Sequence, residues 1–92
     1  MYYIIMSHNF DAQTCIYEFE KYDKAKAFLH WDWENYYNTE LSEGSYLNRG
    51  ACYHEDEYAR VEWEDGCQTE WNLVEGLDKP SPEFEEVWKT YV

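Results

Sequence analysis

The sequence predicts a small α+β domain, with one antiparallel sheet of about four strands and two helices in the order β-β-α-β-β-α. Three observations support this fold class. Several short segments alternate apolar and polar residues, a helix-compatible stretch separates two pairs of such segments, and Asp65-Gly66 marks a hairpin turn. A chain of 92 residues is enough for one domain, so we interpret residues 1–92 as a single α+β unit.

The first two segments predict a β-hairpin. Tyr2–His8 is rich in residues with high β propensity and forms the first expected strand. Thr14–Glu20 alternates in polarity, which places Cys15, Tyr17 and Phe19 on one face of the second strand. The polar residues between these segments predict the turn that joins them.

A helix is expected next. Asp23 can cap a helix that begins at Lys24, and Gly44 can end it near Leu41–Glu43. The residues after it, 44–57, read as a loop or an irregular strand. At the end of the chain, Ser81 suits the N-cap position of a second helix with Pro82 at its first turn. The apolar stripe of that helix would consist of Phe84, Val87, Trp88 and Tyr91.

The segments Tyr58–Trp63 and Cys67–Val74 predict a second hairpin, and its register can be chosen from the sequence. A three-residue loop with Gly66 in the left-handed conformation separates core from solvent residues better than a two-residue turn does. This register pairs Trp63 with Cys67, Val61 with Thr69, Ala59 with Trp71, Arg60 with Glu70, and Glu62 with Gln68. We expect Arg60 and Glu70 to form a cross-strand ion pair.

Negative charge is concentrated in the second part of the chain. Residues 1–31 have a net charge of −1, whereas residues 32–92 carry sixteen acids and four bases, a net charge of −12. Such a balance argues against direct binding to nucleic acid or to anionic membranes, since both need Lys and Arg. The apolar N-terminal segment lacks the basic region of a signal peptide, so the three cysteines are expected to be reduced thiols in the cytoplasm.

Catalytic and metal-binding motifs are weak. Cys52 and His54 could belong to a metal site with Cys67, His8 or His30, but zinc sites normally show two closely spaced ligand pairs. No nucleophile elbow, phosphate-binding glycine loop or His-Glu-x-x-His sequence occurs. We therefore predict no metal, no cofactor and no enzymatic activity.

Two binding surfaces are the remaining candidates. The run Trp31-Asp32-Trp33 could form a platform on which a sugar stacks, although aromatic residues are also enriched at protein interfaces. Carboxylates two residues apart on a strand stand about 6.6 Å apart on one face and can occupy Arg and Lys sites built for phosphates. The expected acidic contacts are Glu55, Asp56, Glu57, Glu62, Glu64, Asp65 and Glu70, with Tyr53 and Tyr58 as aromatic anchors.

In size, in the charge of residues 32–92 and in acidic β segments such as Val61-Glu62-Trp63-Glu64-Asp65-Gly66, the chain resembles small anti-defence proteins of bacteriophages. These include anti-CRISPR proteins and DNA-mimic anti-restriction proteins. The resemblance implies stoichiometric inhibition in the host cytoplasm, by blocking a basic nucleic-acid channel in a partner such as a CRISPR effector. The alternative function is a generic interaction domain that forms a homodimer or pairs with another subunit through its aromatic surface.

Overall fold

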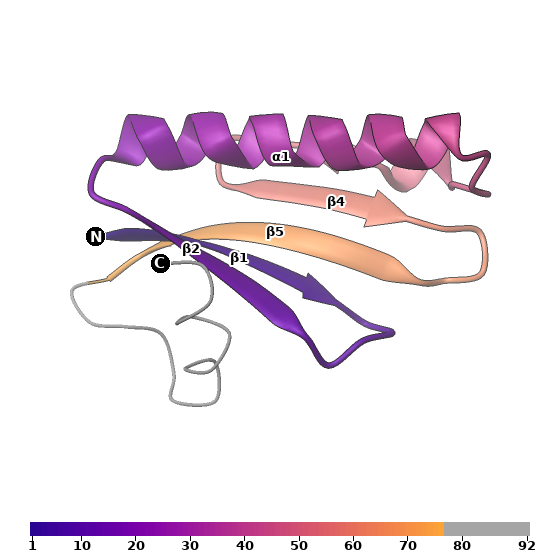
Figure 1. Cartoon of the computed structure of the whole chain (residues 1–92), viewed down its shortest axis with the longest axis horizontal. Coiled ribbons are helices and arrows are strands. Elements are labelled where there is room, and N and C mark those ends of the chain that lie inside the picture. Colours follow the sequence, from indigo (N-terminus) through magenta and orange to yellow (C-terminus); the bar gives the residue numbers. More distant parts are fainter. Residues whose placement is uncertain (77–92) are drawn as a thin grey trace.

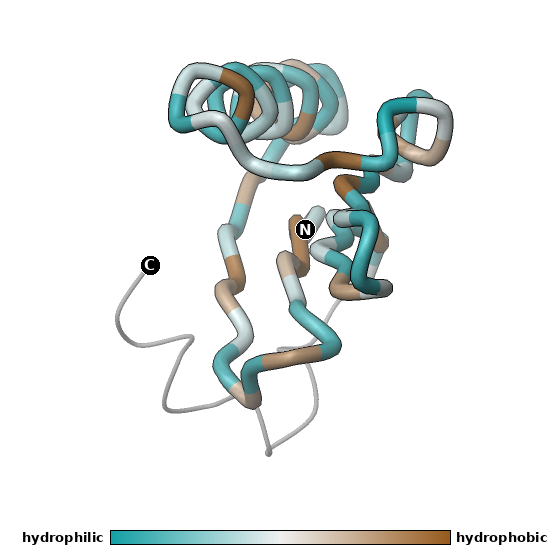
Figure 2. Tube along the Cα trace, turned by 90° about the vertical axis from the view of Figure 1, so that its right-hand side faces the viewer, coloured by the Kyte–Doolittle hydropathy of each residue, from teal (hydrophilic) through white to brown (hydrophobic). Residues whose placement is uncertain are grey.

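The structure, a computed structural model, describes residues 1–76. These residues form a five-stranded antiparallel sheet with one long helix on one of its faces (Figure 1). The strands and helices follow in the order β1 (Tyr2–His8), β2 (Thr14–Phe19), α1 (Tyr22–Ser42), a 3-10 turn η1 (Arg49–Ala51), β3 (Tyr53–His54), β4 (Tyr58–Glu62) and β5 (Gln68–Glu75). Figure 2 shows α1 nearly end-on, as a separate layer beside the strands.

The order of strands in the sheet is β2-β1-β5-β4-β3. The two hairpins expected from the sequence, β1–β2 and β4–β5, are therefore both present, and they join through β1 and β5 at the centre of the sheet. Ile4 pairs with Tyr17 on one side and with Leu73 on the other. The pairing of β1 with β5 links segments more than sixty positions apart in the chain.

The β4–β5 register agrees with the three-residue loop. Ala59 pairs with Trp71 and Val61 with Thr69, and the backbone N–H of Trp63 donates to the carbonyl of Cys67 at 2.9 Å. Gly66 has a φ of 93°, the left-handed conformation that this loop requires. The chemistry of the turn and the alternation of the two strands therefore set the register of this hairpin.

Replacing Gly66 with alanine should lower the free energy of unfolding by about 1–2 kcal/mol, because a Cβ is disfavoured at a positive φ. A Cβ built there meets no atom within 4 Å, so the cost comes from the backbone alone. Gly50→Ala is the matched control, since its new Cβ would make only an ordinary contact 4.0 Å from the Asn48 side chain. Urea unfolding of both variants measures the effect, and equal stabilities would contradict it.

The helix α1 begins earlier than the sequence indicated. Lys21 occupies the N-cap position without a side-chain cap, and its carbonyl accepts the N–H of Ala25 at 3.1 Å. The expectation that Asp23 caps the helix is wrong, because Asp23 lies within the first turn, where its charge still favours the positive end of the helix dipole. The expected end is confirmed: Gly44 has a φ of 76°, and the N–H of Ser45 donates to the carbonyl of Glu40 at 3.1 Å.

The main core lies between α1 and the sheet. Ala25 and Leu29 of α1 are fully buried against alternate residues of the strands, and Trp71 of β5 is the largest side chain with no exposed surface. The indole N–H of Trp71 donates to the Asp32 carboxylate of α1 at 2.9 Å, so this buried polar group is satisfied. A second, smaller cluster of Tyr3 and Ile16 is buried on the opposite face of the sheet.

Some sequence expectations need correction. The strand count of about four omitted β3, which has only two residues and is too short to show alternation. The element order within residues 1–76 is consequently β-β-α-β-β-β apart from η1. The predicted second helix, with its stripe Phe84, Val87, Trp88 and Tyr91, lies outside the described residues.

Candidate functional site

Five of the seven acidic residues singled out from the sequence lie in two groups at opposite ends of β4. Glu55, Asp56 and Glu57 form the turn that precedes this strand, and Glu64 and Asp65 form the turn that follows it. The whole of β4, five residues or about 17 Å in length, lies between the two groups. One contiguous surface therefore does not contain all of the expected contacts.

The turn before β4 contacts the first half of α1. Asp56 forms an ion pair with Lys26 at 3.4 Å, and the carbonyl of Glu55 accepts a hydrogen bond from His30 Nε2 at 2.9 Å. Burial raises the pKa of the Tyr22 phenol, and the charge of Glu57 raises it further. This acidic run is thus partly neutralised by its own helix.

Glu62 and Glu70 lie on the face of the sheet away from α1, because they alternate with the buried residues of β4 and β5. The predicted Arg60–Glu70 ion pair is wrong: Arg60 faces Glu70 in the register but binds Glu62, two residues along the same strand, at 2.6 Å. The other oxygen of Glu62 accepts a hydrogen bond from the Asn48 amide at 2.9 Å. Glu62 therefore holds the loop before β3 against β4.

The two tyrosines expected as anchors are neighbours on this face, with ring centroids 5.9 Å apart. Tyr53 is exposed, whereas burial raises the pKa of the Tyr58 phenol, and a hydrogen bond to the Glu70 carboxylate raises it further. Both rings lie beside Arg60 rather than beside the acidic turn at residues 64 and 65. Tyr58 is thus tied to its own sheet.

The turn after β4 is held against the end of α1. The N–H of Glu64 donates to the carbonyl of Tyr46 at 2.9 Å, and Leu47 forms a β-bridge with Trp63. These contacts bring Glu40 and Glu43, near the end of the helix, to the same end of the molecule as the turn. We call the four carboxylates of Glu40, Glu43, Glu64 and Asp65 the acidic end.

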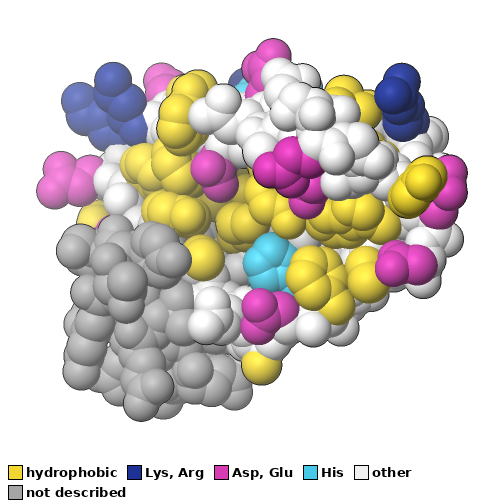
Figure 3. All heavy atoms as spheres, turned by 45° about the vertical axis from the view of Figure 1, so that its right-hand side comes forward, with side chains coloured by type: hydrophobic (Ala, Val, Ile, Leu, Met, Phe, Trp, Pro, Cys, Tyr) yellow, Lys and Arg dark blue, Asp and Glu magenta, His cyan; other side chains and the backbone are white. Residues whose placement is uncertain are grey.

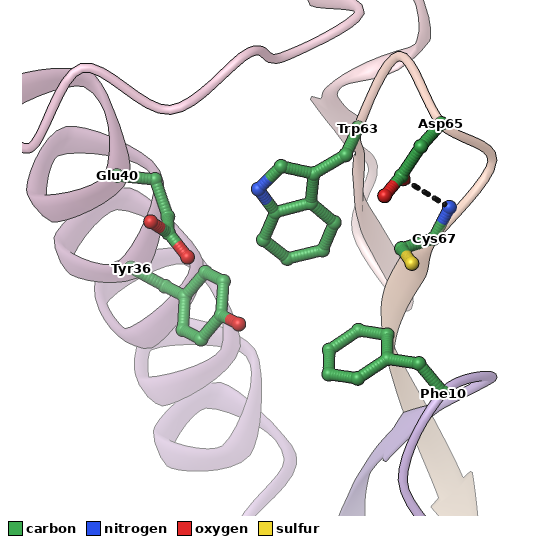
Figure 4. Close-up of a pocket in the computed structure, with 6 residues that line it drawn as sticks. All are labelled: Phe10, Tyr36, Glu40, Trp63, Asp65 and Cys67. Atoms are coloured by element: carbon green, nitrogen blue, oxygen red, sulfur yellow. Dashed lines mark hydrogen bonds between the residues drawn. The ribbon is translucent and has the colours of Figure 1, made fainter.

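A pocket of about 330 Å³ opens at the acidic end (Figure 4). Its walls come from α1, from the β4–β5 hairpin and from the β1–β2 turn, and consist of Phe10, Tyr36, Glu40, Trp63, Asp65 and Cys67. The ring centroid of Trp63 lies 5.6 Å from that of Phe10 and 6.1 Å from that of Tyr36, with both pairs close to perpendicular. Three aromatic rings and two carboxylates therefore face one space.

Two further hollows adjoin this pocket. One of about 270 Å³ follows α1 and shares Tyr36 and Glu40, and one of about 470 Å³ shares Trp63 and Asp65. Neither Lys nor Arg is among the residues that line the three hollows. In Figure 3 a band of hydrophobic side chains crosses one face of the molecule, with Asp and Glu above and below it.

The charges at the acidic end follow from local contacts. The backbone N–H of Cys67 donates to Asp65 at 3.0 Å and holds the pKa of this carboxyl below its usual range, so Asp65 is ionised at neutral pH. The same carboxylate, followed by burial, raises the pKa of the Cys67 thiol, which stays neutral. Burial also raises the pKa of Tyr36. The last turn of α1 has no basic residue to offset the negative end of its dipole.

His8 packs against Phe10, one of the residues that line the pocket, and the centroids of the two rings are 5.0 Å apart. Its Nδ1 lies 2.6 Å from the hydroxyl of Thr69, which is buried. Burial lowers the pKa of His8, and the charge of Asp11 acts against this shift. The imidazole is therefore neutral at pH 7, and His8 adds no positive charge to this side of the pocket.

Sequence reasoning did not find Glu40, Glu43, Phe10, Tyr36 and Trp63 as site residues. The spacing of Tyr36, Glu40 and Glu43 at i, i+4 and i+7 does place them on one helix face, and that signal could have been used. Phe10 and Trp63 come from other elements, and no local pattern relates them to the helix.

The alternative sites are dispersed by the fold. Trp31 is 59% exposed, Asp32 points to Trp71, and the indole N–H of Trp33 donates to the carbonyl of Arg60 at 2.8 Å, so the three do not form one platform. Of the candidate metal ligands, His54 and His30 lie together, with ring centroids 4.6 Å apart, whereas Cys52 lies beside the backbone of Asn48. Among residues 1–76, no three His, Cys, Asp or Glu side chains are grouped so that they could hold a metal ion.

In the described part of the chain, no helix combines the length and the apolar character that crossing a membrane requires. No family model, curated protein or solved structure matches this chain.

Proposed function

We propose that the protein is a non-enzymatic inhibitor or binding protein that occupies a basic, nucleic-acid-binding site on a partner protein, such as a CRISPR effector. One observation carries the proposal. The acidic end places four carboxylates around three aromatic rings, and neither Lys nor Arg lines the hollows between them.

The chemistry of such a surface matches a phosphate-binding site. A carboxylate and a phosphate both present several oxygens to a guanidinium fork, so a row of carboxylates can take the place of a nucleic-acid backbone. Charge alone gives fast association and little affinity, whereas desolvated aromatic anchors supply binding energy. Phe10, which is 51% exposed, and Trp63 line the same pocket as two of the carboxylates and can act as such anchors.

The structure favours carboxylates at the acidic end over those on β4 and before it as contact residues. Glu62 has partners for both of its oxygens, and Asp56 is paired with Lys26. Glu64 and Glu43 are exposed and make no hydrogen bond or ion pair through their carboxylates with another residue of the described range 1–76. We therefore propose Glu64 and Asp65, together with Glu40 and Glu43, as the main acidic contacts with the partner. The inhibition would take place in the host cytoplasm.

The proposal can be tested by displacement of DNA. A purified RNA-guided effector is loaded with its fluorescent target duplex, and the protein is added at increasing salt. We expect displacement that weakens steeply between about 50 and 200 mM salt, because charge contacts dominate the encounter. A polyglutamate peptide is the control for charge without aromatic anchors, and it should displace far less DNA.

Failure to displace DNA from a panel of such basic proteins at low salt would contradict the proposal. Equal displacement by polyglutamate would also do so, because the folded acidic end would then add nothing.

Self-association through aromatic residues is a second candidate. The ring centroid of the exposed Trp31 lies 6.0 Å from that of Phe28. The ring centroid of Phe28 lies 4.6 Å from that of Tyr17, which belongs to β2, an edge strand of the sheet. Exposed aromatics beside a sheet edge are typical of interfaces. Light scattering over a concentration series distinguishes the two functions, since an inhibitor that acts as a monomer keeps a constant mass.

A further inference from the structure

We propose that the pocket between Phe10, Tyr36 and Trp63 receives one guanidinium group, the end of an arginine side chain of the partner. This inference rests on the proposed function and names the partner group that the acidic end recognises. The pocket volume, about 330 Å³, lies at the lower limit of the roughly 300–1,000 Å³ found for small-molecule sites. It therefore suits one side chain better than a longer segment.

The aromatic walls favour a flat cation. Trp63 stands nearly perpendicular to Phe10, at 89°, and to Tyr36, at 79°. Figure 4 shows the indole between these two rings, with all three side chains directed into the same space. A cation that lies against a ring face is attracted by the π electrons, and Trp gives the strongest attraction of the aromatic residues.

Two carboxylates border the same space from opposite walls, and each is oriented by a hydrogen bond. Glu40 Oε2 accepts the Ser45 hydroxyl at 2.6 Å, and Asp65 Oδ1 accepts the N–H of Cys67 at 3.0 Å. The second oxygen of Glu40 has no hydrogen-bond partner within residues 1–76 and can accept one from a ligand. Asp65 also interacts with the Cys67 thiol, but the two oxygens of a carboxylate accept about four hydrogen bonds in total, so Asp65 can still accept one from a ligand.

Arginine fits this arrangement better than lysine. A guanidinium is planar, has five N–H donors in a fixed fork and stacks on aromatic faces, whereas an ammonium is a compact and strongly hydrated charge. It can therefore contact a ring face and both carboxylates at the same time. The remaining polar groups of the lining, the Tyr36 hydroxyl and the Cys67 thiol, are neutral and do not repel it.

The test is an NMR titration of the full chain with acetyl-arginine-amide, with the citrulline and lysine analogues as comparisons. Citrulline has the shape of arginine without its charge. We expect the Trp63 indole N–H resonance to shift with arginine, less with lysine and very little with citrulline. Equal shifts with arginine and citrulline, or shifts that leave Trp63 unaffected, would overturn the inference.

Two variants locate the site. Glu40→Gln and Asp65→Asn keep the shape of each side chain and should each reduce arginine affinity about tenfold, since a charge-assisted hydrogen bond is about twice as strong as a neutral one. Glu34→Gln is the matched control, because Glu34 is exposed on α1 and does not line the pocket. Spectral dispersion shows that each variant is folded, and a Glu40→Gln effect no larger than that of Glu34→Gln would overturn the site.

The outcomes separate this inference from the proposed function. If arginine binds at Trp63 but the protein displaces no DNA, the arginine pocket is supported and the proposed inhibitor function is contradicted. If Glu40→Gln and Asp65→Asn displace DNA as well as the unmodified protein does, the arginine pocket is wrong, whereas the inhibitor function is still supported through Glu43 and Glu64.

Discussion

Replacing Trp71 with alanine should lower the free energy of unfolding by about 3–5 kcal/mol, the usual cost of truncating a buried aromatic residue. Trp71 has no exposed surface, contacts the core on the helix side of the sheet and pairs across β4 with Ala59 and across β1 with Met6. Its loss also removes the hydrogen bond to Asp32 and leaves that carboxylate half-buried without this donor. Small domains have only about 5–15 kcal/mol of stability in total, so the variant should be largely unfolded at modest urea concentrations.

Tyr46→Ala is the control for this experiment, because Tyr46 is 80% exposed and its removal should change stability by less than about 0.5 kcal/mol. Far-UV circular dichroism during urea unfolding measures both variants without depending on tryptophan fluorescence. Asp32→Ala isolates the polar part of the effect, and it should cost about 1–3 kcal/mol by leaving the buried indole N–H unpaired. Similar stabilities for Trp71→Ala and Tyr46→Ala would show that the core is not arranged as described.

The second large effect concerns binding to the basic partner. The double variant Glu43→Lys/Glu64→Lys should weaken DNA displacement by about 30-fold or more, because it sets like charges against each other, which costs several kcal/mol. Both side chains are exposed, and a lysine at position 43 stands at the helix C-terminus, where a positive charge is favourable. The variant is therefore expected to fold, and the loss should be greatest at low salt.

The matched control is Glu20→Lys/Glu75→Lys, which changes the net charge by the same amount at the opposite end of the molecule. The register places both residues near Tyr2, which pairs with Phe19 and with Glu75. An equal loss in the two double variants would indicate that total charge, rather than the acidic end, governs binding.

Local chemistry explains which parts of the fold were predictable. The register of β4 and β5 follows from Gly66 and from the alternation on each strand, and every expected pair from Ala59 to Glu62 is present. The end of α1 at Gly44 follows for the same reason, since few residues other than glycine adopt a positive φ easily. The start of α1 was placed too late because its N-cap, Lys21, has no capping side chain to mark it.

Side-chain pairing was less predictable than backbone pairing. Arg60 faces Glu70 in the register, as expected, yet its guanidinium binds Glu62. A long side chain on a strand can reach the opposite residue or its neighbour two positions along the same face, and the Asn48 contact fixes Glu62 in place. The sequence pattern contains the candidates for such a pair but not the choice between them.

The amino-acid sequence by itself determined the two hairpins, the single long helix within residues 1–76 and the strong negative charge, because each depends on neighbouring residues. Only the tertiary structure decided which carboxylates lie together. The pairing of β1 with β5 brings Phe10 to the β4–β5 turn, and the Tyr46–Glu64 hydrogen bond brings the end of α1 to the same place. These contacts join residues far apart in the chain, and they arise from burial of a shared core, which no short sequence pattern encodes.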